Sequence, residues 1–551
     1  MYKLPTVCVA AVLLPASAAF AASGTAPDLG LQIDRMLSAT YQPDAPGVTV
    51  IVVKDGKTLL RKGYGMADLA QKRLLAPDTV MRIGSLTKQF TATAILMLVD
   101  EGKIKLDDDI TVYLPDYLAG NKKITIENLL THTSGIVSYT SKPDYRSNMP
   151  VDRTVKQMIN GFKNDPLEFE PGSHFHYNNS GYFLLGAIIE NVSGKTYDKF
   201  VEERIFVPLG MTRTAYEGHE RSKAPRAVGY SRGEQGFAPS VPISMTQPYA
   251  AGSLVSTVGD LARWDAAVSS GKLLKAATWQ RAFTPYILSD GKSTGYGYAW
   301  ETGKFLGLPM NGHSGGINGF NTYALRLPTE KVYVAVLSNA DSGLPMADDI
   351  AMRAAAIAIG KPFPEFKEIR LPASALDALS GTYQFDAGVK RAFRREGDNL
   401  VMQGSGGGQV GLNAFSETGF FIPNTLSVVE FARDAQGHPT TVTLRAYNDE
   451  QVGTRSGDAP PSRVTVKIDN AGFDALAGRY QIAPEFVIEL TRDGERYFAQ
   501  ATNQPKLEVF AANDTTFFAR QVAVELSFED GAGGPLTLSQ NGRKIKGAKL
   551  H

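Results

Sequence analysis

Ser85-Leu86-Thr87-Lys88 is the segment whose residue types and spacing could do chemistry. A serine hydroxyl is a poor nucleophile and needs a base to take its proton. Ser85 and Lys88 stand three residues apart, which puts them one turn apart on the same face of a helix. A lysine held out of water has a lowered pKa and can act as that base. The spacing alone is weak, because it recurs at Ser269–Lys272 and Ser289–Lys292, two turn-rich stretches that we expect at the surface.

A buried helix is expected to position this pair. The residues from Phe90 to Val99 are apolar nearly all round, which predicts a buried helix that Gly102 can end. The helix would begin just after Ser85, so its N-terminus would bring free N–H groups and positive dipole beside the serine. A second helix is predicted after Asn179, where apolar residues recur at helical spacing: Leu184, Leu185, Ile188, Ile189 and Val192.

Strand patterns flank these helices. The segment Val48–Val53 has the apolar character of a strand. The segment Thr322–Leu337 has the alternation of apolar and polar residues that is typical of strands. Strands and helices together predict an α+β domain in which helices pack against an antiparallel sheet.

Two further segments could supply catalytic groups. Tyr177-Asn178-Asn179 stands just before the second helix, and His313-Ser314-Gly315-Gly316 stands just before a strand. Residues 312–316 also fit G-x-S-x-G, the nucleophile elbow of another hydrolase fold. That elbow needs a helix after the serine, whereas an alternating strand follows here. We therefore expect Ser85, and not Ser314, to be the nucleophile.

His174 and His176 could ligate a metal from one face of a strand. The chain has only seven histidines, and no carboxylate cluster accompanies this pair. A structural role is therefore expected for both, and also for His132 in the loop Thr131–Gly135. The sequence predicts no metal site and no cofactor.

Composition narrows the class of protein. The chain has 551 residues, of which 43% are hydrophobic and 21% charged, as in a globular chain of several domains. The net charge of +1 gives no electrostatic reason to expect nucleic acid as a partner. Cys8 is the only cysteine, which excludes a disulfide framework, a cysteine-ligated zinc and, once Cys8 is removed, a thiol nucleophile.

The first residues are typical of a secretory signal peptide. Lys3 precedes an apolar run over Val7–Leu14, and Ala19-Phe20-Ala21 offers an A-x-A cleavage site. The apolar run is short for a membrane anchor, and no later stretch is apolar enough to span a bilayer. Residues 1–21 are thus expected to be removed, leaving an exported bacterial protein of the periplasm or the extracellular space.

An internal repeat follows the first domain. Asp377–Gln384 matches Asp474–Gln481 at six of eight positions, and each copy opens a run of short strands. Arg455–Ser462 is a predicted linker between the two runs. Closure into barrels would remove exposed strand edges. We expect one large domain over residues 22–365 and small antiparallel β-barrels over residues 370–460 and 463–551.

Three segments together resemble the motifs of class C-type serine β-lactamases and penicillin-recognising peptidases: Ser85–Lys88, Tyr177–Asn179 and His313–Gly316. Longer signatures are similar to that family over roughly residues 30–360: Arg82–Phe90, Leu129–Gly135, Val207–Met211 and Ala251–Thr257. The added C-terminal units make the layout similar to that of the D-aminopeptidases of this family. The resemblance implies a β-lactamase-like catalytic domain followed by two lipocalin-like barrels.

The resemblance also implies roles for single residues. Ser85 would be acylated, Lys88 would be its base, and Tyr177 would carry protons between the nucleophile, leaving group and water. Asn179 would contact Lys88 and bind the substrate amide. The backbone N–H groups of Ser85 and Gly316 would form the oxyanion hole, next to Gly315. His313 would stand where the family often has the lysine of Lys-Thr-Gly.

These observations predict an exported serine hydrolase that forms an acyl-enzyme on amide or ester bonds, with peptides that contain D-residues as the favoured substrates. An esterase, a β-lactamase and a non-catalytic penicillin-binding sensor are the alternatives, because one fold serves all of them. A small peptide, an ester or a β-lactam is the expected partner. The sequence leaves the oligomeric state open.

Overall fold

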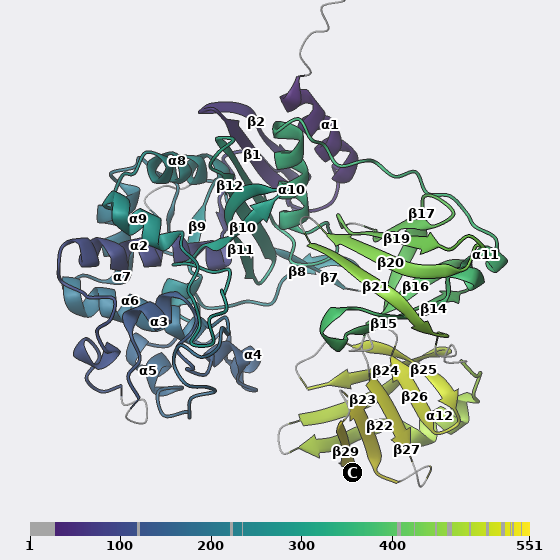
Figure 1. Ribbon diagram of the computed structural model, residues 1–551. Helices are drawn as coiled ribbons and strands as arrows, with labels where there is room; N and C mark the ends of the chain where they lie inside the picture. The colour runs from purple at the N-terminus through teal and green to yellow at the C-terminus, as the bar shows by residue number, and fades with distance from the viewer. Residues whose placement is uncertain are drawn as a thin grey trace, which may run out of the picture.

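A six-stranded antiparallel sheet lies at the centre of the N-terminal domain (Figure 1). The computed structural model describes residues 28–550 except 118–121, 221–223, 234, 405–408, 424, 447–448, 460–464, 484–485, 503–505, 520–523, 529–530, 532–533 and 541–542. The predicted signal peptide, residues 1–21, lies outside the described residues. The sheet order is β10 (Glu301–Phe305), β11 (Leu308–Ile317), β12 (Phe320–Leu327), β13 (Val332–Ser338), β1 (Val48–Lys54) and β2 (Lys57–Tyr64).

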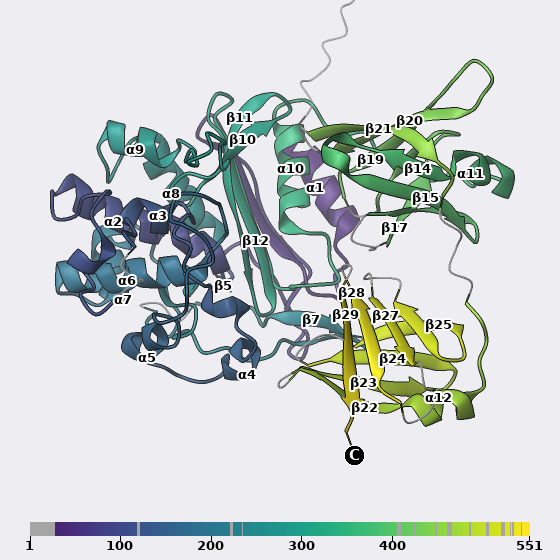
Figure 2. The same cartoon turned by 60° about the horizontal axis from the view of Figure 1, so that its bottom comes forward.

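Helices cover both faces of this sheet. Figure 2 shows α1 (Leu29–Thr40) and α10 (Ala347–Ala358) on one face, with the helical region that includes α8 (Val258–Ser269) on the other. Strands β12 and β13 are therefore buried along nearly their whole length. The strand-like segment that the sequence predicted over Thr322–Leu337 consists of two paired strands, because a turn over residues 328–331 divides it.

The helical region is built around two helices that the sequence predicted. Helix α2 (Thr87–Asp100) is buried from Thr87 to Leu98, and α6 (Asn179–Ser193) is buried from Ser180 to Ile189. The Asn178 side chain caps α6 by accepting from Gly181 N at 2.9 Å. Five shorter helices surround them: α3 (Ile126–Leu130), α4 (Tyr145–Asn148), α5 (Val155–Asn160), α7 (Tyr197–Val201) and α9 (Ala276–Ala282).

Two closed eight-stranded antiparallel barrels follow, which confirms the predicted fold class. The first runs from β14 (Gly381–Gln384) to β21 (Asp449–Gly457), and the second from β22 (Gly478–Ala483) to β29 (Arg543–Lys549). Since β21 runs to Gly457, the linker predicted from Arg455 begins later than expected. Residues 460–462 of that linker lie outside the described residues.

The repeat has the same contacts in both barrels. It covers the end of a short helix and the first strand, in α11 (Ala373–Leu379) with β14 and in α12 (Asn470–Leu476) with β22. Tyr383 Oη donates to Leu379 O at 3.1 Å, and Tyr480 Oη donates to Leu476 O at 2.6 Å. Each repeat aspartate also accepts from an arginine at 2.8 Å, Asp377 from Arg395 and Asp474 from Arg492. Matching contacts show that the two copies are one structural unit used twice.

The first barrel packs against the N-terminal domain. Leu426 lies in the same hydrophobic cluster as α1 and α10, and Arg353 of α10 donates to Thr425 O at 2.8 Å. Both barrels also have aromatic cores of their own. None of the helices in the described part of the chain has the length and apolarity to cross a bilayer.

Candidate active site

Ser85 lies in a short 3₁₀ turn, η1 (Gly84–Leu86), that leads directly into α2. Gly84 has φ of +50°, a conformation that favours glycine. A β-carbon on Gly84 would lie 3.0 Å from Gly316 N, so the turn and strand β11 meet backbone against backbone. The turn therefore holds a half-buried Ser85 at the edge of the sheet.

Lys88 is fully buried one turn further along the helix. Its Nζ lies 3.1 Å from Ser85 Oγ, 2.9 Å from Asn179 Oδ1 and 2.9 Å from Ala251 O. Burial lowers the pKa of Lys88 well below its usual value. The structure thus brings together Ser85 and Lys88, as their spacing predicted, and Asn179, as the family resemblance implied.

Tyr177 stands beside this pair at the start of the segment that leads into α6. Lys88 Nζ lies 4.8 Å from the centre of the Tyr177 ring, and the hydroxyl oxygen is shielded from solvent. Burial raises the pKa of Tyr177, and the neighbouring Ser85 hydroxyl opposes that rise. Tyr177 therefore keeps its proton at neutral pH.

The His313–Gly316 segment belongs to β11, at the edge of the sheet nearest to Ser85. Strand β10 pairs with β11 only as far as Gly312, so the following residues lie beyond that pairing. A β-carbon on Gly315 would come within 2.2 Å of Ile83 O and of Thr322 Oγ1, which explains why glycine stands there. Ser314 does not stand in a nucleophile elbow, because such an elbow needs a helix after the serine. Here strand β11 continues through Ser314 and strand β12 follows.

His313 is buried, and both of its ring nitrogens have protein partners. Nδ1 lies 2.6 Å from Ser314 O and Nε2 lies 2.7 Å from Tyr296 Oη. A carbonyl oxygen only accepts, so Nδ1 carries the proton and Nε2 accepts from Tyr296. Burial lowers the pKa of His313, while Glu301 opposes the fall. His313 is thus a neutral, saturated group next to the candidate site.

His132 completes a directional chain of hydrogen bonds. Its Nδ1 accepts from Asn178 N at 3.1 Å, so Nε2 carries the proton and faces Tyr296 Oη at 3.3 Å. The ring also lies 4.3 Å from the ring of Tyr177, centre to centre. This hydrogen-bonded row of His132, Tyr296 and His313 therefore holds Tyr177 and Asn178 in place through His132. Sequence reasoning assigned His132 to its own loop and missed Tyr296 altogether, since no motif marks it.

The other histidine pair is placed differently. His174 and His176 lie in an exposed loop, where His174 Nδ1 lies 2.8 Å from Ser173 Oγ and His176 Nδ1 lies 2.6 Å from Glu168 Oε2. Among the described residues, no group of three or more His, Cys, Asp or Glu side chains could hold a metal ion.

The chain is similar to known proteins. The family model described as Beta-lactamase matches residues 33–359. Protein flp of Staphylococcus aureus (strain N315) is 31% identical over 320 residues, which cover 56% of this chain and 63% of that protein. The chain thus spans less than two thirds of the length of that curated relative.

Two solved structures are similar. The octameric penicillin-binding protein homologue from Pyrococcus abyssi is 27% identical with a TM-score of 0.57, covering 77% of this chain and 99% of that chain. The D-amino acid amidase from Ochrobactrum anthropi SV3 is 26% identical with a TM-score of 0.51, covering 61% of this chain and 98% of that chain.

Proposed function

The chain belongs to the beta-lactamase family, a family of serine hydrolases, and from this premise we propose that it hydrolyses amide or ester bonds through an acyl-enzyme on Ser85. The observation that carries the proposal is the set of three partners around Lys88 Nζ. A neutral amine has two N–H donors and one lone pair. Asn179 Oδ1 and Ala251 O only accept, so they take the two N–H groups. The lone pair is left for the Ser85 hydroxyl.

Proton transfer follows from this geometry. Lys88 takes the Ser85 proton as Oγ attacks the substrate carbonyl, and a C–O bond forms as the carbonyl oxygen becomes negative. Tyr177 keeps its proton at neutral pH, so it can donate to the departing amine or alcohol and recover a proton from Lys88. Water then attacks the acyl-enzyme with the same groups acting in reverse.

Backbone N–H groups are the candidates for stabilising the oxyanion. Ser85 N lies in the turn that opens α2, and the close approach of Gly84 to Gly316 brings a second N–H to that turn. Two such donors on either side of a carbonyl oxygen favour the tetrahedral intermediate. We assign this role to Ser85 and Gly316, with Gly315 as the residue that allows the approach.

Amides of D-amino acids are the substrates that we propose first. The similar structure from Ochrobactrum anthropi is named a D-amino acid amidase. In addition, a neutral His313 with both nitrogens occupied offers no cation to a substrate carboxylate. Substrates without a free carboxylate next to the reacting bond are therefore expected to be preferred. We also propose export, on the basis of the signal-like residues 1–21.

A panel of substrates tests this assignment. Purified protein should hydrolyse D-phenylalanine amide with a higher kcat/KM than L-phenylalanine amide and than a matched D-peptide ending in a free carboxylate. The preference over the carboxylate substrate should be the same at pH 6 and pH 8, because both ring nitrogens of His313 already have protein partners.

Other outcomes of the panel point elsewhere. Faster turnover of p-nitrophenyl acetate or of a chromogenic cephalosporin than of any D-amide would favour an esterase or a β-lactamase. Stable acylation by a penicillin without turnover of any substrate would favour a sensor and contradict the hydrolase assignment. Ser85→Ala is the control, and it should be inactive on every substrate.

A further inference from the structure

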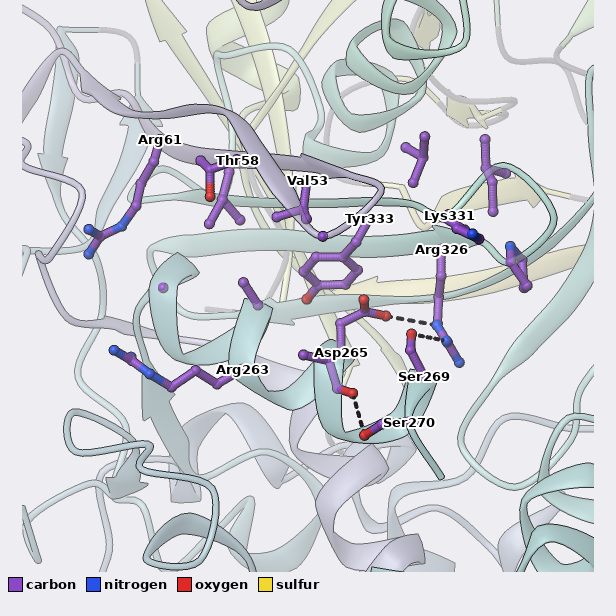
Figure 3. A pocket seen from close by; sticks show the side chains of 18 residues that line it. Val53, Thr58, Arg61, Arg263, Asp265, Ser269, Ser270, Arg326, Lys331 and Tyr333 are labelled. Atoms are coloured by element: carbon purple, nitrogen blue, oxygen red, sulfur yellow. Dashed lines mark hydrogen bonds and ion pairs between the residues drawn. The ribbon is translucent and has the colours of Figure 1, made fainter. Parts of the chain in front are cut away.

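A cavity of about 790 Å³ lies between helix α8 and the sheet face that this helix covers (Figure 3). Its walls come from α8, from β1 and β2, and from the β12–β13 hairpin. Of the described residues that line it, none belongs to the candidate active site. Arg326 in this cavity stands four residues along β12 from Thr322, which contacts Ile83 beside Ser85. Four residues of strand span about 13 Å, so the two sites are separate.

The cavity has an apolar interior. Side chains of Ile51, Val53, Ala262 and Ala266 contribute to its lining. Its volume lies within the 300–1,000 Å³ range typical of small-molecule sites and far exceeds the space that one water occupies. A ligand with an apolar body therefore fits the interior.

A buried arginine lies at one end of this interior. Arg326 is 8% exposed, its Nε lies 2.8 Å from Asp265 Oδ1, and its Nη2 donates to Ser269 Oγ at 2.7 Å. The contact with Asp265 is an ion pair, and Ser269 takes one of the five N–H donors of the guanidinium. The planar group is held over the rings of Phe283 and Trp300, 5.3 Å and 6.0 Å from their centres. The arginine is thus fixed in place with donors to spare.

A tyrosine hydroxyl in the cavity has no partner. Tyr333 is 4% exposed, and its Oη makes no hydrogen bond to any described residue. Figure 3 shows this hydroxyl turned toward helix α8, near Asp265. A buried polar group without a partner costs free energy. A ligand that accepts a hydrogen bond here would remove that cost.

Positive charge dominates the remaining lining. Arg61, Arg263, Arg326 and Lys331 face one carboxylate, Asp265, among the lining residues. Arg263 pairs with Asp260 at 2.7 Å and Arg61 pairs with Asp78, whereas Lys331 forms no ion pair with a described residue. Lys331 therefore leaves one uncompensated positive charge at the exposed side of the cavity, and this charge attracts an anion.

We propose that this cavity is a second ligand site, which binds a small amphipathic carboxylate with its apolar body inside and its anionic head toward Arg326 and Lys331. The Tyr333 hydroxyl donates to an oxygen of the same ligand. Three features point to that class together: an apolar interior, fixed cationic donors and a buried donor without a partner.

The site is placed to affect catalysis. Helix α8 contacts α2 through Trp264, whose Nε1 donates to Gln89 Oε1 at 3.1 Å and whose ring lies 4.6 Å from that of Phe90. Gln89 is the residue after Lys88. A ligand that shifts α8 would therefore also move residues next to the catalytic lysine.

Octanoate is the probe that tests the proposal, with octylamine as the matched cation. The chain has three tryptophans, and all of them belong to one aromatic run beside Arg326: Trp264, Trp279 and Trp300, linked through Phe283. Octanoate should therefore change the intrinsic fluorescence saturably, and calorimetry should give one binding site. Both signals should persist in Ser85→Ala, which separates this site from the catalytic one.

Three variants locate the binding. Ala266→Leu fills the cavity from an exposed position of α8 and should weaken octanoate binding about tenfold or more, whereas Ala277→Leu, exposed on α9, should not. Tyr333→Phe removes one hydrogen bond and should weaken binding about three- to tenfold. The proposal is overturned if octanoate does not bind, if octylamine binds equally well, or if Ala266→Leu and Tyr333→Phe bind octanoate like the parent.

Discussion

Among single residues, the buried amine of Lys88 would set the pH range in which Ser85 is activated in the proposed mechanism. Only the neutral amine has a lone pair for the serine proton, and burial lowers the pKa of this lysine well below 10.5. The hydrolytic activity of the protein should therefore rise with pH as Lys88 loses its proton. The pKa of Tyr177 is raised, so loss of its proton should set no alkaline limit near neutral pH.

Lys88→Met tests this role. Methionine keeps the length of the side chain but supplies no base, so kcat/KM on the best substrate should fall about a hundred- to ten-thousandfold. The acid limb of the pH profile should disappear from the residual activity. Lys272→Met is the control, because Lys272 is exposed and belongs to a Ser-x-x-Lys match away from α2. Activity of Lys88→Met within tenfold of the parent would show that another group is the base.

Sequence alone was sufficient for the residues whose spacing carries the chemistry. Ser85, Lys88 and Asn179 come together because two buried helices, α2 and α6, present their first turns to each other. Tyr296 could not be predicted in this way. It is one of 22 tyrosines, and its role depends on two histidines that lie 164 and 17 residues away in the chain.

Among the elements, the contact between turn η1 and strand β11 fixes the position of Ser85 N and Gly316 N, the two donors that we propose for the oxyanion. Helix α2 was predictable from its continuous apolar run and α6 from apolar residues at helical spacing, since each buries most of its surface. The turn between β12 and β13 was not predicted, because the apolar pattern over Thr322–Leu337 marks strands and not the connection between them.

Gly315→Ala tests the contact between η1 and β11. Its methyl group would meet backbone at Ile83 O, so the strand must move away from the turn. We expect a lower Tm, from a cost of about 1–3 kcal/mol, and a lower kcat/KM. A β-carbon on Gly316 would meet nothing within 4 Å, so Gly316→Ala should keep the Tm of the parent. Equal Tm values for the two variants would contradict the close contact.

At the scale of the whole molecule, the first barrel packs against the N-terminal domain through Leu426 and Thr425. The repeat predicted two similar units, and the shared tyrosine and aspartate contacts explain why its residues match. The packing of Leu426 against α1 and α10 could not be read from the sequence, since one apolar loop residue has no periodicity.

Two shortened chains test whether the first barrel stabilises the N-terminal domain. A chain that ends at Asp458 keeps the first barrel, so its catalytic domain should unfold at the same temperature as in the full chain. A chain that ends at residue 365 loses the burial of Leu426, a side chain whose burial contributes about 1.5–3 kcal/mol, and the bond from Arg353 to Thr425. It should stay folded with a lower Tm, measured by calorimetry. An unchanged Tm would show that the first barrel does not stabilise the domain.

The most direct test of the central claim is the site of acylation. Trypsin cuts after Arg82 and Lys88 to give a six-residue peptide with Ser85, and Ser314 falls in the separate peptide Phe305–Arg326. After reaction with a slowly hydrolysed penicillin, mass spectrometry should find the added mass on the Ser85 peptide alone. The adduct should vanish in Ser85→Ala and persist in Ser314→Ala. An adduct on the Ser314 peptide, or one that survives Ser85→Ala, would contradict the account.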